Sequence, residues 1–246
     1  MEVPIPHPEL KSLLPDVPFL CGAGTWSEGL DTMPLGEGPG PSIRRTLFGD
    51  MPLADWCGGR ATGEPWSRFA RARDLLAKKD TDRAAAELER IVATPGLESR
   101  HYIQAWQVLR EIGREPPEDQ ADRVFGVVVE VSLDTGVDLL AAYADRHARY
   151  YNFSGAGVVW DRPDGSLDEP ITRLLDAGQA VADKTGTWDE PRPGVPPKGQ
   201  VRFSMLTPGG IHFGQGTFEA FAGDPMAANV LGAATALMQN LIEKKP

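Results

Sequence analysis

Apolar residues recur at helical spacing in three successive segments between residues 66 and 113. The positions are Trp66, Phe69, Ala70, Leu75 and Leu76 in the first segment, Ala85, Leu88, Ile91 and Val92 in the second, and Tyr102, Ile103, Trp106, Leu109 and Ile112 in the third. This spacing is typical of amphipathic helices. Asp80 is placed to cap the second helix, and Gly113 is placed to end the third. The pattern therefore predicts a small helical subdomain at residues 66–113.

A linker containing two prolines, at residues 115–119, is followed by a region in which the hydrophobic period is two. Asp145 and Arg146 are typical of a tight turn between two antiparallel strands. Strands are predicted at 125–131, 139–144, 147–153, 158–160, 201–206 and 211–213, and helices at 168–183 and 227–242. Because consecutive hairpins exclude a parallel doubly wound sheet, we expect an α+β fold over residues 123–246. It consists of an antiparallel sheet with helices packed on one or both faces.

The core of this α+β domain is predicted from the apolar phase of each element. We expect the side chains that share this phase to be mostly buried, namely Val127, Val129, Val131, Trp160, Leu174, Leu231 and Leu237. The last helix, at 227–242, is apolar on nearly all sides, which also indicates burial.

The last hairpin is placed in register by requiring its apolar residues to share one face. A three-residue loop at 208–210 sets Thr207 opposite Ile211. The buried face then carries the apolar side chains Phe203, Met205, Ile211 and Phe213. The other face carries three polar side chains, Arg202, Ser204 and His212. A two-residue loop separates the apolar set, so we reject that register.

The N-terminal segment is rich in residues that interrupt regular structure. Residues 1–65 hold 10 glycines and 10 prolines. The segment also carries large apolar residues that are rare in disordered tails, namely Phe19, Leu20, Trp26, Leu47, Phe48, Leu53 and Trp56. We predict a Gly/Pro-rich arm that packs these residues on the folded body. The alternative is a long linker with incidental hydrophobic residues.

Two partial resemblances to known families follow from these patterns. Residues 82–88, Asp-Arg-Ala-Ala-Ala-Glu-Leu, are similar to a tetratricopeptide helix, although the aromatic and proline positions of that family are out of register and no third repeat is present. A plain helical hairpin with an extra helix is the interpretation we prefer for 66–113. The element order of 123–243, together with the strand–turn–strand around Asp145, resembles roadblock, profilin or PAS-type modules. That resemblance implies a small domain that binds proteins or small ligands.

The charge of the chain argues against two classes of partner. The net charge is −10, from 35 acidic and 25 basic residues, and no long stretch is basic. Binding to nucleic acid or to anionic membranes needs such a stretch. No apolar run reaches the roughly 18 residues of a membrane span. Residues 1–6 lack the basic and apolar pattern of a secretion signal, so we expect a cytoplasmic protein.

Neither a metal site nor a cofactor site is predicted. The two cysteines, Cys21 and Cys57, are too few for a disulfide scaffold or a four-thiolate zinc site. They form either a bridge or two unrelated buried thiols. The histidines, at positions 7, 101, 147 and 212, are too scattered for a local metal motif. The glycines around Ser154 lack the spacing and lysine of a phosphate loop.

Three groups of residues are candidates for a functional site. Arg202, Ser204 and His212 are neighbours in the predicted register, where His212 can serve as a base or hydrogen-bond donor, or lie on a solvent-facing polar surface. Residues 146–151 form a compact cationic and aromatic cluster, in which alternation puts Arg149 and Tyr151 on one face, beside His147. Trp188 lies in a proline-rich loop that forms either an interface or a cap on a sheet edge.

The function that these features favour is a non-enzymatic, cytosolic protein-interaction or scaffold module. We expect the strand pair at 139–153 to present Arg149 and Tyr151 to a protein partner or a second copy of the chain. The opposing interpretation is that Arg149 pairs with a nearby aspartate while Tyr151 packs under the N-terminal arm. The alternative functions are a small-ligand sensor with a pocket between sheet and helix, and a hydrolase-type enzyme that uses His212 without a nucleophile-elbow motif.

Overall fold

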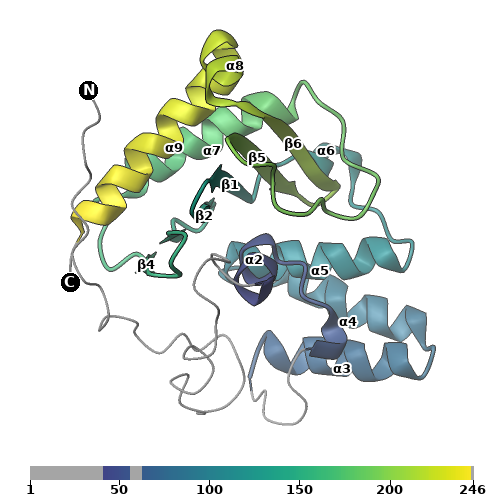
Figure 1. Cartoon of the computed structure of the whole chain (residues 1–246). Coiled ribbons are helices and arrows are strands. Elements are labelled where there is room, and N and C mark those ends of the chain that lie inside the picture. Colours follow the sequence, from purple (N-terminus) through teal and green to yellow (C-terminus); the bar gives the residue numbers. More distant parts are fainter. Residues whose placement is uncertain (1–40, 56–62, 245–246) are drawn as a thin grey trace, which may run out of the picture.

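The computed structural model describes residues 41–55 and 63–244 (Figure 1). The three helices predicted between 66 and 113 are present as α3 (Trp66–Ala77), α4 (Thr81–Ala93) and α5 (Ser99–Glu111). Asp80 caps α4, because its side chain accepts a hydrogen bond from the backbone N–H of Arg83. The three helices enclose a core of their own around Phe69, Leu88 and Leu109, which are fully buried.

The remaining chain builds a six-stranded sheet in which every neighbouring pair is antiparallel. The strands are β1 (Gly126–Leu133), β2 (Gly136–Tyr143), β3 (Ala148–Tyr151), β4 (Gly157–Trp160), β5 (Gln200–Thr207) and β6 (Gly210–Thr217). Their spatial order is β4-β3-β2-β1-β5-β6, because β5 returns along the free side of β1. The predicted α+β fold with an antiparallel sheet is confirmed.

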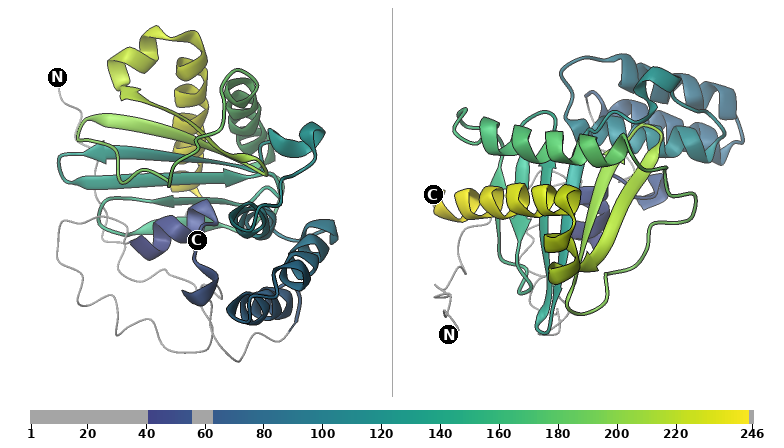
Figure 2. Two further views of the ribbon diagram at one scale, coloured as in Figure 1. Left: turned by 90° about the vertical axis from the view of Figure 1, so that its right-hand side faces the viewer. Right: turned by 90° about the horizontal axis from the view of Figure 1, so that it is seen from above.

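One face of the sheet, called the first face below, is covered by α7 (Asp168–Ala182), α8 (Phe218–Gly223) and α9 (Pro225–Glu243). Figure 2 shows α7 and α9 lying side by side on this side of the strands. Gly178 lets α7 approach closely, since a Cβ there would lie 2.6 Å from Val127 Cγ2. Of the predicted core residues, Val127, Val129, Trp160, Leu174 and Leu237 are buried, whereas Val131 and Leu231 are partly buried against the same core.

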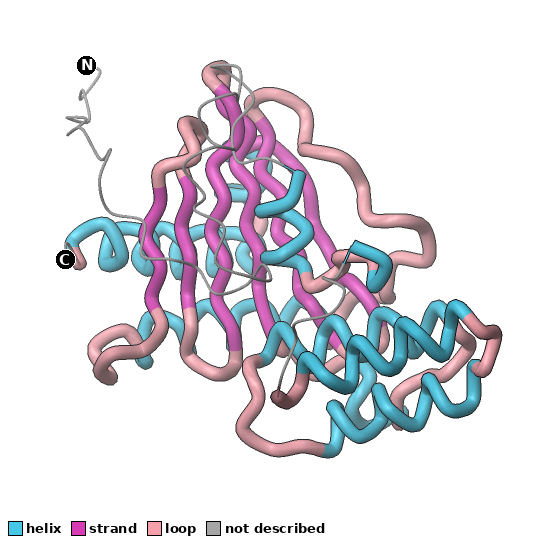
Figure 3. The backbone as a smooth tube through the Cα atoms, turned by 90° about the horizontal axis from the view of Figure 1, so that it is seen from below, coloured by secondary structure: helices cyan, strands magenta, loops and turns pink. Residues whose placement is uncertain are grey.

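The opposite face, called the second face, is covered by α5 and by α2 (Pro41–Phe48). Leu47 and Phe48 of α2 and Ile103 of α5 pack against Val128 and Tyr143 of the sheet. Figure 3, seen from below, shows the strands side by side with helices on both sides. The sheet is therefore the middle layer of three.

Helix α2 lies within the segment that the sequence predicts to be a Gly/Pro-rich arm packed on the folded body. Leu47, Phe48 and Leu53, three of the apolar residues singled out there, are buried. Pro41 begins α2, where a missing N–H is tolerated. The cysteines and the apolar residues Phe19, Leu20, Trp26 and Trp56 lie outside the described residues. The short helices α6 (Glu118–Ala121) and α8 were also not predicted.

The register predicted for the last hairpin is wrong. Thr207 pairs with Gly210 and Met205 pairs with His212, so Pro208 and Gly209 form the two-residue loop that we rejected. The error has a physical cause: both faces of β5 and β6 are covered, so their apolar residues need not share one face. Phe203 and Met205 lie on the first face, whereas Leu206 and Ile211 lie on the second.

Candidate functional site

Arg149 and Tyr151 share the second face, as strand alternation predicts, but that face is not exposed. Their exposed fractions are only 4% and 8%. Tyr151 packs in the core that contains Leu47 and Phe48 of α2. Arg149 Nη2 donates to Asp161 Oδ1 at 3.1 Å. The exposed aromatic and cationic surface expected on this strand is therefore absent, and the geometry follows the opposing interpretation.

The turn between β2 and β3 is held against the beginning of α5 by reciprocal hydrogen bonds. The backbone N–H of Ser99 donates to Asp145 Oδ2 at 2.6 Å, and that of Asp145 donates to Ser99 Oγ at 3.0 Å. Asp145 Oδ1 accepts a further bond from the N–H of His147. Arg146 adopts a φ of 72°, which closes the turn. As a result, the first turn of α5 lies beside the strand that carries Arg149.

This arrangement gathers four nitrogen-bearing side chains, which we call the buried cation cluster: Arg100, His101, His147 and Arg149. The exposed fractions of Arg100, His101 and Arg149 are 3%, 5% and 4%. Arg100 Cζ lies 5.7 Å from the centre of the Tyr143 ring, and Arg100 also pairs with Glu98. His147 Nδ1 lies 3.7 Å from Asp145 Oδ2. The cluster thus lies between a sheet face and a helix terminus.

Arg149 has unused hydrogen-bonding capacity. Its Nε and Nη1 are buried and have no hydrogen-bond partner in the part of the chain that the structure describes. Leaving charged donors desolvated and unpaired costs free energy, so native proteins usually supply an acceptor for them. The two nitrogens can donate to oxygens of an anion.

The electrostatics of the cluster favour fixed charges over titrating groups. Burial lowers the pKa of His101 to about 4, and the nearby positive charge of Arg100 acts in the same direction. His101 is therefore neutral at pH 7. Burial raises the pKa of Tyr143 and of Tyr151. Burial alone would raise the pKa of Glu98, but the charge and hydrogen bond of Arg100 hold it below its ordinary value. Arg100 and Arg149 therefore supply permanent positive charge.

The second candidate group, Arg202, Ser204 and His212, is not one site. In the observed register Arg202 and Ser204 lie on the second face, whereas His212 lies on the first. Nδ1 of His212 lies 3.0 Å from the carbonyl oxygen of Thr185, just beyond α7. Its Nε2 lies 3.3 Å from Asp122 Oδ1, although the geometry is not that of a hydrogen bond. His212 therefore connects the hairpin to the end of α7 and has no access to Ser204.

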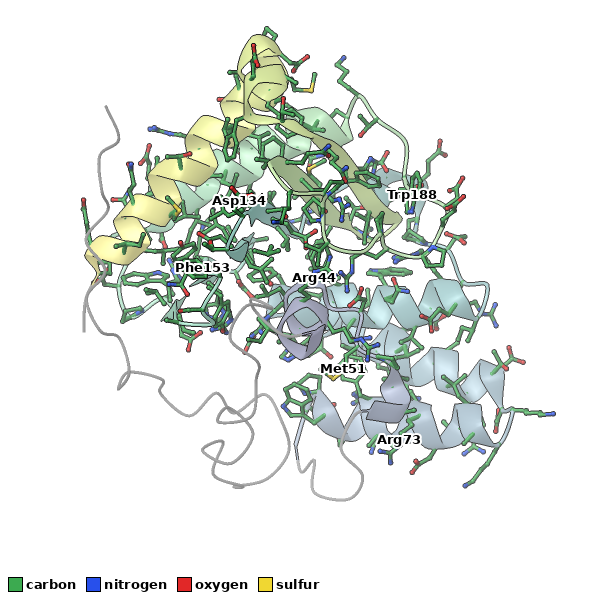
Figure 4. The ribbon with its side chains drawn as sticks, in the orientation of Figure 1. Arg44, Met51, Arg73, Asp134, Phe153 and Trp188 are labelled. Atoms are coloured by element: carbon green, nitrogen blue, oxygen red, sulfur yellow. The ribbon has the colours of Figure 1, made fainter. Side chains whose placement is uncertain are left out.

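Sequence reasoning missed a buried ionic network that attaches α2 to the sheet. Glu130 of β1 is fully buried, and its carboxylate lies 2.7 Å from an Arg44 nitrogen and 3.3 Å from Arg202 Nη1. Figure 4 shows Arg44 on α2 below the sheet. Arg192 pairs with Asp50 and lies 4.1 Å from the centre of the Phe48 ring. A single acid within the apolar run of β1 was the signal for this network.

Trp188 lies in the loop between α7 and β5 and is 40% exposed (Figure 4). Its backbone N–H donates to the carbonyl of Ile211 at 2.8 Å, on edge strand β6. Its ring packs edge-on against Phe213, with 5.1 Å between ring centres. This loop therefore covers part of the sheet edge, which is the geometry of the structural alternative predicted for it.

Comparisons with known proteins add no family to these observations. No protein-family model matches the chain, and no curated protein and no solved structure matches it either. Across residues 41–55 and 63–244, no group of three or more His, Cys, Asp or Glu side chains could hold a metal ion. Within the same residues, no helix combines the length and the apolar character needed to cross a membrane.

Proposed function

We propose that this protein is a non-enzymatic binding protein that recognises a small anionic ligand, carrying a carboxylate or phosphate group, at the buried cation cluster. The observation that carries the proposal is Arg149, whose side chain is buried while Nε and Nη1 lack acceptors among the described residues. The cluster lies between sheet and helix, the region where the small-ligand hypothesis expects a pocket. The cytoplasm is its expected location.

An anion can reach the cluster by displacing an exposed carboxylate. Asp161, which pairs with Arg149, has a side chain that is 63% exposed, and Glu98, which pairs with Arg100, is 33% exposed. In both pairs the carboxylate is much more exposed than the buried arginine, so a ligand anion can replace the carboxylate without leaving the guanidinium group unpaired. An oxygen of the ligand would then accept charge-assisted hydrogen bonds from buried guanidinium groups, which are stronger than neutral ones.

Binding is better supported than hydrolysis. The three residues that could have formed a hydrolytic site are split between opposite faces of the sheet. Nucleophilic catalysis needs a nucleophile and a base within hydrogen-bond reach of one another. Arg100 and Arg149 are permanent donors, which suits them to hold an anion in place.

The test uses inorganic phosphate and acetate as probes, with sodium chloride at equal ionic strength as the reference. A ligand that binds only the folded state raises the unfolding temperature by mass action. We expect phosphate or acetate to stabilise the protein beyond chloride, and Arg149→Gln to abolish that stabilisation. Arg173→Gln is the matched control, because Arg173 is 62% exposed on the far side of the sheet.

A second variant keeps the test decisive if Arg149→Gln folds poorly. Asp161→Asn removes the exposed carboxylate that competes for Arg149, so it should strengthen the response to the probes. Equal responses to phosphate, acetate and chloride, or a weaker response in Asp161→Asn, would overturn the proposed site.

A further inference from the structure

Helices α7 and α9 cover the same sheet face, but their outward sides differ in charge. The exposed residues of α7 include Glu169, Arg173 and Asp176. Residues 225–242, which form nearly all of α9, contain no charged side chain in a chain that is 24% charged. The exposed positions of α9 are Met226, Asn229, Gly232, Thr235, Gln239 and Ile242, together with flanking Pro225 and Glu243. One outward helix face is therefore uncharged along almost its whole length.

The two ends of this face are apolar. Met226 is 38% exposed and Ile242 is 45% exposed, so each leaves a large hydrophobic side chain in water. The middle of the face is open, because a Cβ placed on Gly232 meets no atom within 4 Å. At a rise of about 1.5 Å per residue, the two apolar ends are about 24 Å apart. A partner for this face therefore needs an apolar group at each end and can approach the helix closely at Gly232.

The face is complementary to a copy of itself turned end to end. Consider an antiparallel pairing of two α9 helices about a twofold axis at position 234. Each residue then faces the residue of the second copy that lies equally far from position 234 on the other side. Met226 then faces Ile242 of the second copy, and Asn229 faces Gln239. Gly232 faces Ala236, where small side chains permit close approach of the two helices. A twofold interface requires this self-complementarity.

The charges that flank the face follow the same pairing. Asp224, the N-cap of α9, falls opposite Lys244, its C-cap, in the second copy. Lys244 Nζ lies 5.7 Å from the centre of the Trp160 ring, so it is held at the end of the helix. Two copies of a chain with a net charge of −10 repel one another. An uncharged face with opposite charges at its two ends is where such copies can meet.

We propose that a second copy of this chain packs against the outer face of α9, with the two α9 helices antiparallel and Met226 of each opposite Ile242 of the other. This surface is separate from the buried cation cluster, which lies on the other side of the sheet (Figure 2). It also differs from the strand pair at 139–153, where the sequence predicts the contact. The proposal is therefore independent of the proposed ligand.

The experiment uses two double variants that differ only at position 229, where one carries a negative and the other a positive charge. Asn229→Glu with Gln239→Glu sets like charges opposite each other twice in the proposed dimer. Asn229→Lys with Gln239→Glu sets opposite charges there twice. Sedimentation equilibrium of the full chain should show a dimer for wild type, a dissociation constant raised by roughly tenfold or more for the Glu/Glu variant, and a dimer for the Lys/Glu variant. Both positions are exposed, so the fold should be retained.

The matched control places the same change in net charge on α7. Arg173→Gln with Ala180→Glu alters the net charge by −2, as the Glu/Glu variant does, and should leave the dimer intact. A monomeric wild type across the micromolar range would overturn the proposal. Equal dissociation constants for the Glu/Glu and Lys/Glu variants would overturn it too, because a parallel pairing sets like charges opposite each other in both variants.

Discussion

The two faces of the sheet are built from alternate residues of the same strands, yet they are buried against chemically different layers. On the first face, Val127, Val129 and Phe203 pack against α7, α8 and α9. On the second face, the alternate positions include the buried polar residues Glu130, Arg149, Arg202 and Ser204. Residues are buried on both faces, so the difference between the faces is one of chemistry.

This difference means that the two faces contribute differently to the free energy of folding. Apolar burial is favourable in itself and contributes about 25 cal/mol per Å² of surface removed from water. Buried charges must first be desolvated, and ion pairs often do no more than offset that cost. The buried charges of the second face therefore carry a desolvation cost that apolar burial on both faces offsets. A buried, incompletely paired arginine on the second face is consistent with a binding role there.

The largest effect that separates the faces is expected at Glu130. Replacing it with Gln leaves Arg44 and Arg202 buried without their shared carboxylate. We expect a loss of about 3–5 kcal/mol in the free energy of unfolding, measured by chemical denaturation. Glu89→Gln, an exposed position on α4, is the control. A loss as small as that of the control would show that the network is not needed to hold α2 on the sheet.

A comparable but slightly smaller effect is expected from a cavity on the first face. Leu237 is fully buried beneath α9, so Leu237→Ala should lower the free energy of unfolding by about 2–5 kcal/mol. Ile242→Ala on the same helix removes an exposed side chain and should change it little. If the denaturation midpoints of the two variants agree, α9 is peripheral to the core.

The smallest effect is a dependence on pH that belongs to the second face. The pKa of His101 falls from 6.5 to about 4 on folding, so the folded state binds fewer protons between these values. Stability is then complete above pH 6.5 and is lost as the pH falls towards 4. At pH 5 the loss amounts to about 2 kcal/mol relative to pH 7. In His101→Gln this part of the slope should disappear, and an unchanged slope between pH 5 and 7 would assign it to other groups.

Periodicity alone located most of the elements correctly. The apolar spacing at 66–112 corresponds to α3, α4 and α5, and the strand at 125–131 corresponds to β1. Local signals suffice for such elements, because amphipathic spacing, a capping aspartate and turn residues act within a few positions of one another. Helix α2 was missed because eight residues between glycine-rich segments carry too short a pattern.

The sequence by itself also indicated that residues 146–151 are unusual, since they combine arginine, histidine and tyrosine in a short strand. It could not show that Arg149 is buried, because burial depends on α5 and α2, whose residues lie between 38 and 108 positions earlier in the chain. The same holds for the partnership of Arg100 with this strand. Such contacts join distant segments and leave no periodic trace in either of them.

Hairpin register, in contrast, was decided by the tertiary structure. Alternation fixes the side of a residue only relative to its strand neighbours, so one covered face is needed to choose between registers. Here both faces of β5 and β6 are covered, and burial alone does not distinguish a two-residue loop from a three-residue one. The packing of α7 and α8 on one face and of α2 and the 186–199 loop on the other made that choice. It thereby separated His212 from Arg202 and Ser204.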